Sequence, residues 1–223
     1  TVTVGGDLSV TTDANSGVIN MGTLAVDGTM ALNTHGSGNA TVVNDSGLNF
    51  AASTVGGSLN ATATAGNIID SGALDVTGAA TFTIAASASI ILDSANVFAG
   101  TTTITAGGGT GALGGLTFTD TGGIKWASSA TDAGDLYVNA DTDGKVTGNL
   151  SLTATTGNIT QGIALAITGT TALTTSANDA TITLANTSNV FTGAITITTN
   201  DASGTDADVT IDGGTTALII AAS

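Results

Sequence analysis

Residues 66–78 read GNIIDSGALDVTG, and residues 157–169 read GNITQGIALAITG. Both stretches alternate apolar with polar residues and are bounded by glycine, which is typical of short β-strands joined by tight turns. They belong to a longer repeat, because residues 55–105 align with residues 146–198 with only two extra residues in the second copy. A weaker copy covers about residues 4–54. Tandem units of several short strands predict a solenoid whose turns stack on each other.

Period-two alternation predicts an all-β chain. The clearest runs are residues 59–65, 80–85, 101–105, 150–155, 180–185 and 194–199. Alanine is plentiful, but it is interleaved with glycine and β-branched residues, and no stretch sustains a helical period. We therefore expect strands with one buried face and almost no helix.

The spacing of the turn residues predicts the type of solenoid. Segments of about 22 to 24 residues, each with three short strands, fit the coil of a right-handed parallel β-helix. Residues 1–223 would form one rod of about nine or ten coils, roughly 45–50 Å long at the usual strand spacing. A Gly-rich segment, residues 106–145, interrupts the repeat. Glycine and asparagine at the corners would supply positive φ.

The same alternation predicts which side chains point into the coil. The expected inward residues are Leu59, Leu74, Val76, Phe82, Ile84, Ile90, Leu92, Phe98, Leu150, Leu165, Ile167, Leu173, Ile182, Leu184 and Phe191. Aromatic residues are only 3% of the chain, so we expect a thin core of stacked small aliphatic side chains.

The charge distribution excludes several partners. All 17 acidic residues are Asp, the only cations are Lys125 and Lys145, and the formal net charge is −15. Such a surface repels nucleic acid and anionic lipid. No apolar run approaches the roughly 18–20 residues of a membrane span, so we expect no membrane insertion. The absence of cysteine is compatible with an oxidising, extracellular location.

The run NLSLTATTGNITQ (residues 149–161) and the residues that follow it to 199 resemble the repeat region of filamentous haemagglutinin-like proteins, the secreted exoproteins of two-partner secretion. The resemblance covers most of the chain, most clearly residues 55–105 and 146–199. It implies a right-handed β-helix on the surface of a Gram-negative bacterium, exported through an outer-membrane pore. It also implies an adhesin or stalk that contacts a glycan or protein on a host or neighbouring cell.

Candidates for enzymatic chemistry are few. His35 is the only histidine and lies in the loop NTHGSGN, where we expect a solvated side chain. Enzymes that act on acidic polysaccharides usually use cationic residues, and this chain has no arginine. We predict that the protein is not an enzyme and needs no cofactor.

A calcium site has a weak candidate in NADTDG (residues 139–144), where Asn139, Asp141 and Asp143 precede a glycine. The position at which an EF-hand loop requires a bidentate glutamate is Leu150. Asn and Asp favour turns for their own reasons, so we interpret this segment as a tight turn rather than a metal site.

Residues 106–145 also hold both lysines, the only tryptophan and the only tyrosine. Lys125, Trp126 and Tyr137 are therefore the candidate contact residues for a glycan or protein partner. We favour the interpretation that Trp126 and Tyr137 instead fill a wider coil or cover an edge.

Recurrent Thr-x-Thr pairs suggest a different class, an ice-binding solenoid. The pairs begin at about residues 62, 81, 101, 117, 153, 181 and 196. Their separations vary too much for all of them to share one face of a regular coil. Threonine is also a common outward strand residue.

We interpret the chain as an extracellular structural or adhesive shaft. The alternatives are the ice-binding solenoid and a subunit of a self-assembling surface fibre. The strand-like segments at residues 1–6 and 215–223 lead us to expect end-to-end self-association or further coils at both ends.

Overall fold

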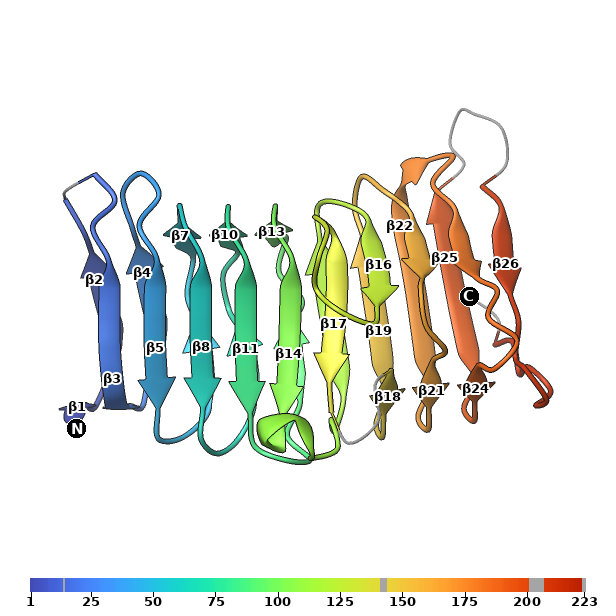
Figure 1. The fold of residues 1–223 in the computed structure, drawn as a ribbon, viewed down its shortest axis with the longest axis horizontal. Coiled ribbons are helices and arrows are strands. Elements are labelled where there is room, and N and C mark those ends of the chain that lie inside the picture. The colour runs from blue at the N-terminus through green and yellow to red at the C-terminus, as the bar shows by residue number, and fades with distance from the viewer. Residues whose placement is uncertain (14, 141–143, 201–206, 222–223) are drawn as a thin grey trace.

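The computed structural model describes residues 1–13, 15–140, 144–200 and 207–221. Their secondary structure is 26 short strands and a single 3₁₀ turn, η1 (Gly107–Gly109). The strands wind into a parallel β-solenoid of about nine turns, seen from the side in Figure 1. The predicted all-β class and β-helical architecture are confirmed.

Two long sheets run along the rod, and every strand pair in them is parallel. Sheet A has 11 strands, in the order β1 (Val2–Val4), β3 (Ile19–Val26), β5 (Ala40–Asn44), β8 (Leu59–Ala63), β11 (Ala80–Ile84), β14 (Thr102–Ala106), β17 (Asp135–Asn139), β16 (Ile124–Ala127), β20 (Ile159–Gln161), β23 (Ile182–Leu184) and β26 (Val209–Ile211). Sheet B has 12 strands. Eleven of them follow in the order β13 (Val97–Phe98), β10 (Leu74–Val76), β7 (Ser53–Val55), β4 (Met30–Asn33), β6 (Leu48–Phe50), β9 (Ile68–Asp70), β12 (Ile90–Leu92), β15 (Leu116–Asp120), β19 (Leu150–Ala154), β22 (Thr171–Asn178) and β25 (Ile195–Asn200), and the twelfth is β2 (Leu8–Thr11), beside β4.

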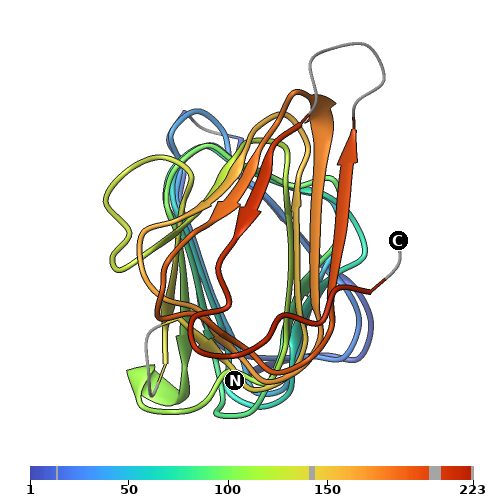
Figure 2. The same cartoon turned by 90° about the vertical axis from the view of Figure 1, so that its right-hand side faces the viewer.

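The third side of the rod is built differently in its two halves. Strand β2 (Leu8–Thr11) pairs with β4, and β4 in turn pairs with both β6 and β7, so sheet B divides around a corner into two columns of strands. In the second half, the third side is the separate sheet C, with the order β18 (Lys145–Val146), β21 (Ala166–Ile167) and β24 (Val190–Phe191). Viewed along the axis, the turns superimpose around a common interior (Figure 2).

One long turn separates the two repeat copies. In the first copy Phe82 pairs with Ile104, but Ile104 pairs next with Val138, which lies much farther along the chain. The sequence separation between paired residues is short again where Leu150 pairs with Thr171. The coil length predicted from the turn residues is therefore wrong for this turn, because residues 106–145 contribute the additional strand β16 and the loop that follows it.

The long turn moves the second repeat copy to a different side of the rod. Strands β8 and β19 align in sequence, yet β8 lies in sheet A and β19 in sheet B. The aligned strands β9 and β20 show the reverse, because β9 lies in sheet B and β20 in sheet A. Equivalent residues of the two copies therefore do not stack in one column.

The core follows the predicted alternation. All of the residues expected to point inward, from Leu59 to Phe191, are at most 5% exposed. The core is less purely aliphatic than we expected, because a row of phenylalanines follows the axis in the first half. Their ring centroids are 6.5 Å apart for Phe50 and Phe82, 5.9 Å for Phe82 and Phe98, and 5.1 Å for Phe98 and Phe118.

Glycine is required at the corners more for close stacking than for positive φ. Gly66 has φ +73°, as predicted, but Gly78 and Gly169, which end the two aligned stretches, do not have positive φ. A Cβ on Gly78 would lie 2.7 Å from the carbonyl carbon of Gly57, and one on Gly169 would lie 2.4 Å from the carbonyl oxygen of Gly148. The prediction that corner glycines supply positive φ is thus wrong at these two positions.

We predict that Gly78→Ala lowers the free energy of unfolding by about 1–3 kcal/mol, because the added methyl group must displace the backbone of the preceding coil. The matched control is Gly22→Ala in β3, where a Cβ has nothing within 4 Å. Urea unfolding monitored by circular dichroism measures both. Equal losses in the two variants would contradict the stacking explanation.

A second prediction compares neighbouring positions on β19. Leu152 is 1% exposed and points inward, whereas Thr153 is partly exposed and points outward. Leu152→Asp places an unpaired charge in the core and should cost about 3–5 kcal/mol, while Thr153→Asp should cost less than about 0.5 kcal/mol. Chemical denaturation of both variants is the measurement, and similar costs would show that the assigned register of β19 is wrong.

Candidate functional site

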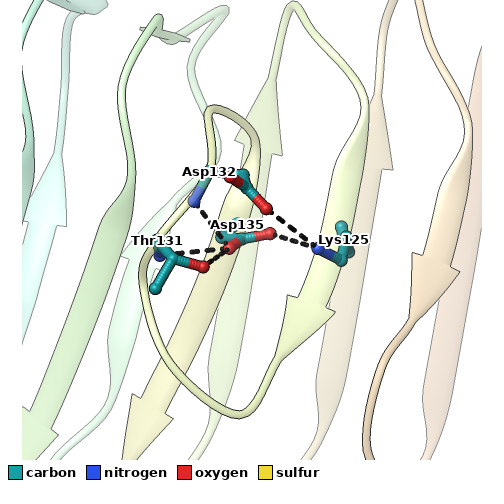
Figure 3. A network of polar contacts seen from close by, with 4 residues as sticks. All are labelled: Lys125, Thr131, Asp132 and Asp135. Carbon is teal, nitrogen blue, oxygen red and sulfur yellow. Dashed lines mark hydrogen bonds and ion pairs between the residues drawn. The ribbon is translucent and has the colours of Figure 1, made fainter.

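The loop between β16 and β17 is the main departure from a plain coil. These strands follow each other in the chain and pair in parallel in the same sheet, with Lys125 opposite Asp135 and Trp126 opposite Leu136. Residues 128–134 must therefore run back along the length of the strands before β17 can begin. Figure 3 shows this loop folded beside the two strands.

Asp135 fixes the loop through both of its carboxylate oxygens. Its Oδ2 accepts hydrogen bonds from the backbone N–H of Asp132 at 2.9 Å, the backbone N–H of Thr131 at 3.1 Å and the Thr131 hydroxyl at 3.2 Å. Its Oδ1 lies 3.0 Å from Lys125 Nζ, and Asp132 Oδ2 lies 3.8 Å from the same ammonium group (Figure 3). The side chain of Asp135 is only 1% exposed, against 48% for Lys125.

These contacts keep the ion pair charged at neutral pH. Burial raises the pKa of Asp135, but the hydrogen bond from Asp132, the Lys125 ammonium and the Thr131 backbone together hold that pKa below its ordinary value. The hydrogen bond and charge of Asp135 raise the pKa of Lys125. The principal contact of Lys125 is thus within its own chain.

An open groove of about 460 Å³ lies next to this network. Lys125, Gly134, Asn158 and Thr160 border it, with Phe98 and Asp120 among its other lining residues. Asp120 is 3% exposed and accepts a hydrogen bond from the Phe98 backbone N–H at 3.0 Å, and its burial raises its pKa. The groove offers a cation that already has a partner, a buried carboxylate and neutral amide and hydroxyl groups.

Comparison with known proteins identifies the repeat. Residues 37–105 and 127–198, more than half of the chain, match the family model described as "Repeats of unknown function (DUF5649)". The chain belongs to this repeat family. No curated protein and no solved structure matches the chain. The two matched stretches contain the two aligned repeat copies, and residues 106–126, about half of the segment between the copies, lie outside both stretches.

In this member of the DUF5649 repeats, the three candidate contact residues do not all face outward. Trp126 is 0% exposed and lies in the core, where its indole N–H finds no hydrogen-bond partner among the described residues. Trp126 as a surface contact is therefore wrong, and the interpretation that it fills a wider coil holds for this residue. Lys125 and Tyr137 both belong to sheet A at outward positions, and their role in binding stays a prediction.

The remaining candidates do not come together. Asn139 ends β17, whereas Asp141 and Asp143 lie outside the described residues. Among the residues that are described, no group of three or more His, Cys or Asp side chains is placed to hold a metal ion. His35 is exposed in the turn before β5, and its backbone N–H donates to the Thr12 hydroxyl at 3.0 Å. Over the same described ranges, no helix is long and apolar enough to cross a membrane.

Sequence reasoning missed the roles of Asp135 and Asp120. The segment TDAGD (residues 131–135) contained a usable signal, because an Asp that follows a Thr-Asp pair by three or four residues can accept their backbone N–H groups. The pairing with Lys125 had no local signal, since it depends on the register of β16 against β17.

We predict that Lys125→Met destabilises the rod at neutral pH, because it leaves a buried carboxylate oxygen of Asp135 without its cation. The folded-state pKa of Asp135 is lowered, so its stabilising contribution is present above the unfolded pKa of about 3.9 and is lost as pH falls through the folded value. The deficit of the variant should therefore shrink on acidification towards pH 3.

Thermal unfolding measured from pH 7 to pH 3 tests this expectation. Lys125→Arg is the matched control, because it keeps a cation opposite Asp135 and should lose less stability than Lys125→Met. A deficit that stays constant across this pH range would show that the ion pair is not its source.

Proposed function

We propose that this chain is a segment of an extracellular shaft that extends from a cell surface and makes adhesive contacts along its length. The observation that carries the proposal is the unbroken parallel ladder: each internal strand of sheet A is hydrogen-bonded to a strand on both sides through 11 strands. Such a ladder has one long dimension and no internal hinge. Repeat solenoids of this kind present extended surfaces in which many weak contacts act together.

The site geometry supports a passive role. The groove beside Lys125 is open, and both described charged groups that line it already have partners within the fold. Lys125 pairs with Asp135, which fixes the loop between β16 and β17, and Asp120 accepts the backbone N–H of Phe98. The described carboxylates lie mainly in turns, which leaves the outward surfaces of the sheets accessible. The negative charge of these carboxylates repels nucleic acid and anionic surfaces at long range. We propose a neutral glycan or a protein on a host or neighbouring cell as the partner.

The resemblance to filamentous haemagglutinin-like repeats supports the finer proposal of two-partner secretion. Under this proposal, the chain crosses an outer-membrane pore unfolded and stays at the surface of a Gram-negative bacterium. An acidic chain with no cysteine and no proline suits such export, because neither disulfide formation nor prolyl isomerisation delays folding outside the cell. End-to-end association of coils into a fibre is a compatible extension of the shaft.

The shaft is tested by measuring its rigidity. The chain has no cysteine, so Thr3→Cys in β1 and Thr210→Cys in β26, both exposed, give a unique pair of dye sites at the two ends of sheet A. Ten strand spacings predict a separation of about 48 Å. Single-molecule energy transfer should give one narrow distribution that persists in urea until cooperative unfolding begins. A broad distribution in native buffer would contradict a rigid shaft.

Adhesion needs a separate measurement. Beads coated with the folded chain should be retained on host or bacterial cell layers under flow, and beads coated with the heat-denatured chain should not. Retention that is equal for both coatings would contradict adhesion by the folded rod. A chain that is rigid but is not retained on cells would support the structural shaft and contradict its adhesive role.

A further inference from the structure

The strand register arranges the threonine pairs into two regular lattices. On sheet A, the outward residues of β5, β8, β11 and β14 form two rows: Thr41, Asn60, Thr81, Thr103 and Val43, Thr62, Thr83, Thr105. We call this surface threonine face A. On sheet B, the outward residues of β15, β19, β22 and β25 form the rows Thr117, Ser151, Ala172, Thr196 and Thr119, Thr153, Thr174, Thr198. We call this surface threonine face B.

This arrangement explains the uneven spacing of the Thr-x-Thr pairs along the sequence. The pairs do not all share one face, as predicted. Thr81 with Thr83 and Thr103 with Thr105 are in register on face A, and Thr117 with Thr119 and Thr196 with Thr198 are in register on face B. Thr62 and Thr153 contribute one residue each to faces A and B, and Thr183 on β23 lies outside both faces. The long turn between β14 and β17 accounts for the difference, because it moves the repeat from sheet A to sheet B. Within each face, the irregular intervals are absorbed by the turns at the corners.

Both faces have two nearly rectangular repeats. Neighbouring strands lie about 4.8 Å apart, and residues two apart on one strand lie about 6.6 Å apart. Threonine is β-branched and stiff at χ1, so each side chain holds its hydroxyl and its methyl group in a narrow range of positions. Little side-chain entropy is therefore lost when such a surface orders a layer of partner groups.

The faces are also free of charge in a chain of net charge −15. Among the strands that form them, the only charged residue is Asp120, and its side chain is buried. Asp27, Asp45, Asp93 and Asp179 lie in turns at the edges of the sheets. A carboxylate on a face would hold its own hydration shell and disturb any ordered water beside it, so this distribution suits an uncharged, ordered partner.

We propose that threonine faces A and B bind the surface of ice. The hydroxyl groups donate and accept hydrogen bonds to ordered water, and the methyl groups between them enclose that water in shallow troughs. The repeat of about 4.8 Å across the strands is close to the shorter oxygen repeat on the prism plane of ice. Because the two faces lie on different sides of the rod, one chain has two such surfaces.

The first test measures thermal hysteresis and the inhibition of ice recrystallisation by the 223-residue chain. The double variant Thr153→Lys with Thr174→Lys disrupts the middle of face B, and Thr83→Lys with Thr105→Lys disrupts face A. Thr54→Lys on β7 with Thr210→Lys on β26, both exposed and outside the two faces, is the charge-matched control. We expect each double variant to lose about half of the activity, the combination of both to lose nearly all of it, and the control to retain it.

The circular dichroism spectrum and unfolding midpoint of each variant establish that it is folded. Should a lysine variant fail to fold, Thr153→Tyr with Thr174→Tyr replaces it, because tyrosine suits a strand and still breaks the flat lattice. A wild-type chain that affects ice growth no more than an equal concentration of serum albumin would overturn the proposal. Activity that survives in the folded double variants would overturn it as well.

Binding to microcrystalline cellulose or chitin in place of ice would also overturn the proposal, in favour of a crystalline polysaccharide as the partner. The ice assays contain no cell, receptor or glycan, so their outcome is independent of the adhesion measurement. Failure of the shaft proposal and failure of ice binding are therefore distinguishable.

Discussion

Direct stacking of one coil on the next is the constraint on which the structure depends. Each strand hydrogen-bonds to the strand one turn away, so the chain must return to the same lateral position at a rise of about 4.8 Å. At the corners this leaves no space for a side chain: the backbone N–H of Gly78 donates to the carbonyl oxygen of Gly57 at 2.9 Å, and a Cβ on Gly78 would overlap that peptide group. At such corners glycine is required by this approach of backbone to backbone.

The same constraint explains the polar residues that are buried at a corner. Asn96 Oδ1 accepts the backbone N–H of Leu74 at 2.7 Å, and its amide donates to Asp70 Oδ2 at 2.7 Å. In the second copy, the aligned Asn189 accepts the backbone N–H of Leu165 at 2.9 Å and bonds to Gln161, which aligns with Asp70. An inward asparagine therefore provides a hydrogen-bond acceptor for a backbone N–H group at a corner, where the sheets leave that group unpaired. The pKa of Asp70 is raised by burial, a cost that the glutamine of the second copy does not carry.

Sequence patterns could predict the strands and the inward residues because both are properties of a few consecutive positions. Alternation placed Phe82 and Leu173 in the core, and two aligned copies implied stacked turns. The shift of the second copy to a different sheet could not be predicted from sequence. It depends on the pairing of the inserted strands, in which β17 pairs with β14 and β16 pairs with β17 and β20. For the same reason the sequence could not decide whether Trp126 contacts a partner or fills a wider coil. Its burial depends on β16 being built into sheet A, where it pairs with β17 and β20.

The long turn thus has a consequence for the surface that no single repeat contains. A repeat that continued in phase would extend threonine face A along the whole rod and would leave sheet B with the outward isoleucines Ile69 and Ile91 of the first copy. Instead, β15 of the intervening segment and then the second copy place threonines on sheet B beyond Ile91. Ile91 pairs with Thr117, and Thr117 pairs with Ser151 of the second copy. The rod therefore has two short ordered faces on different sides in place of one long face. A chain that meets a surface in either of two orientations gains binding opportunities without adding a new structural element, and here an insertion in one coil is sufficient to produce that arrangement.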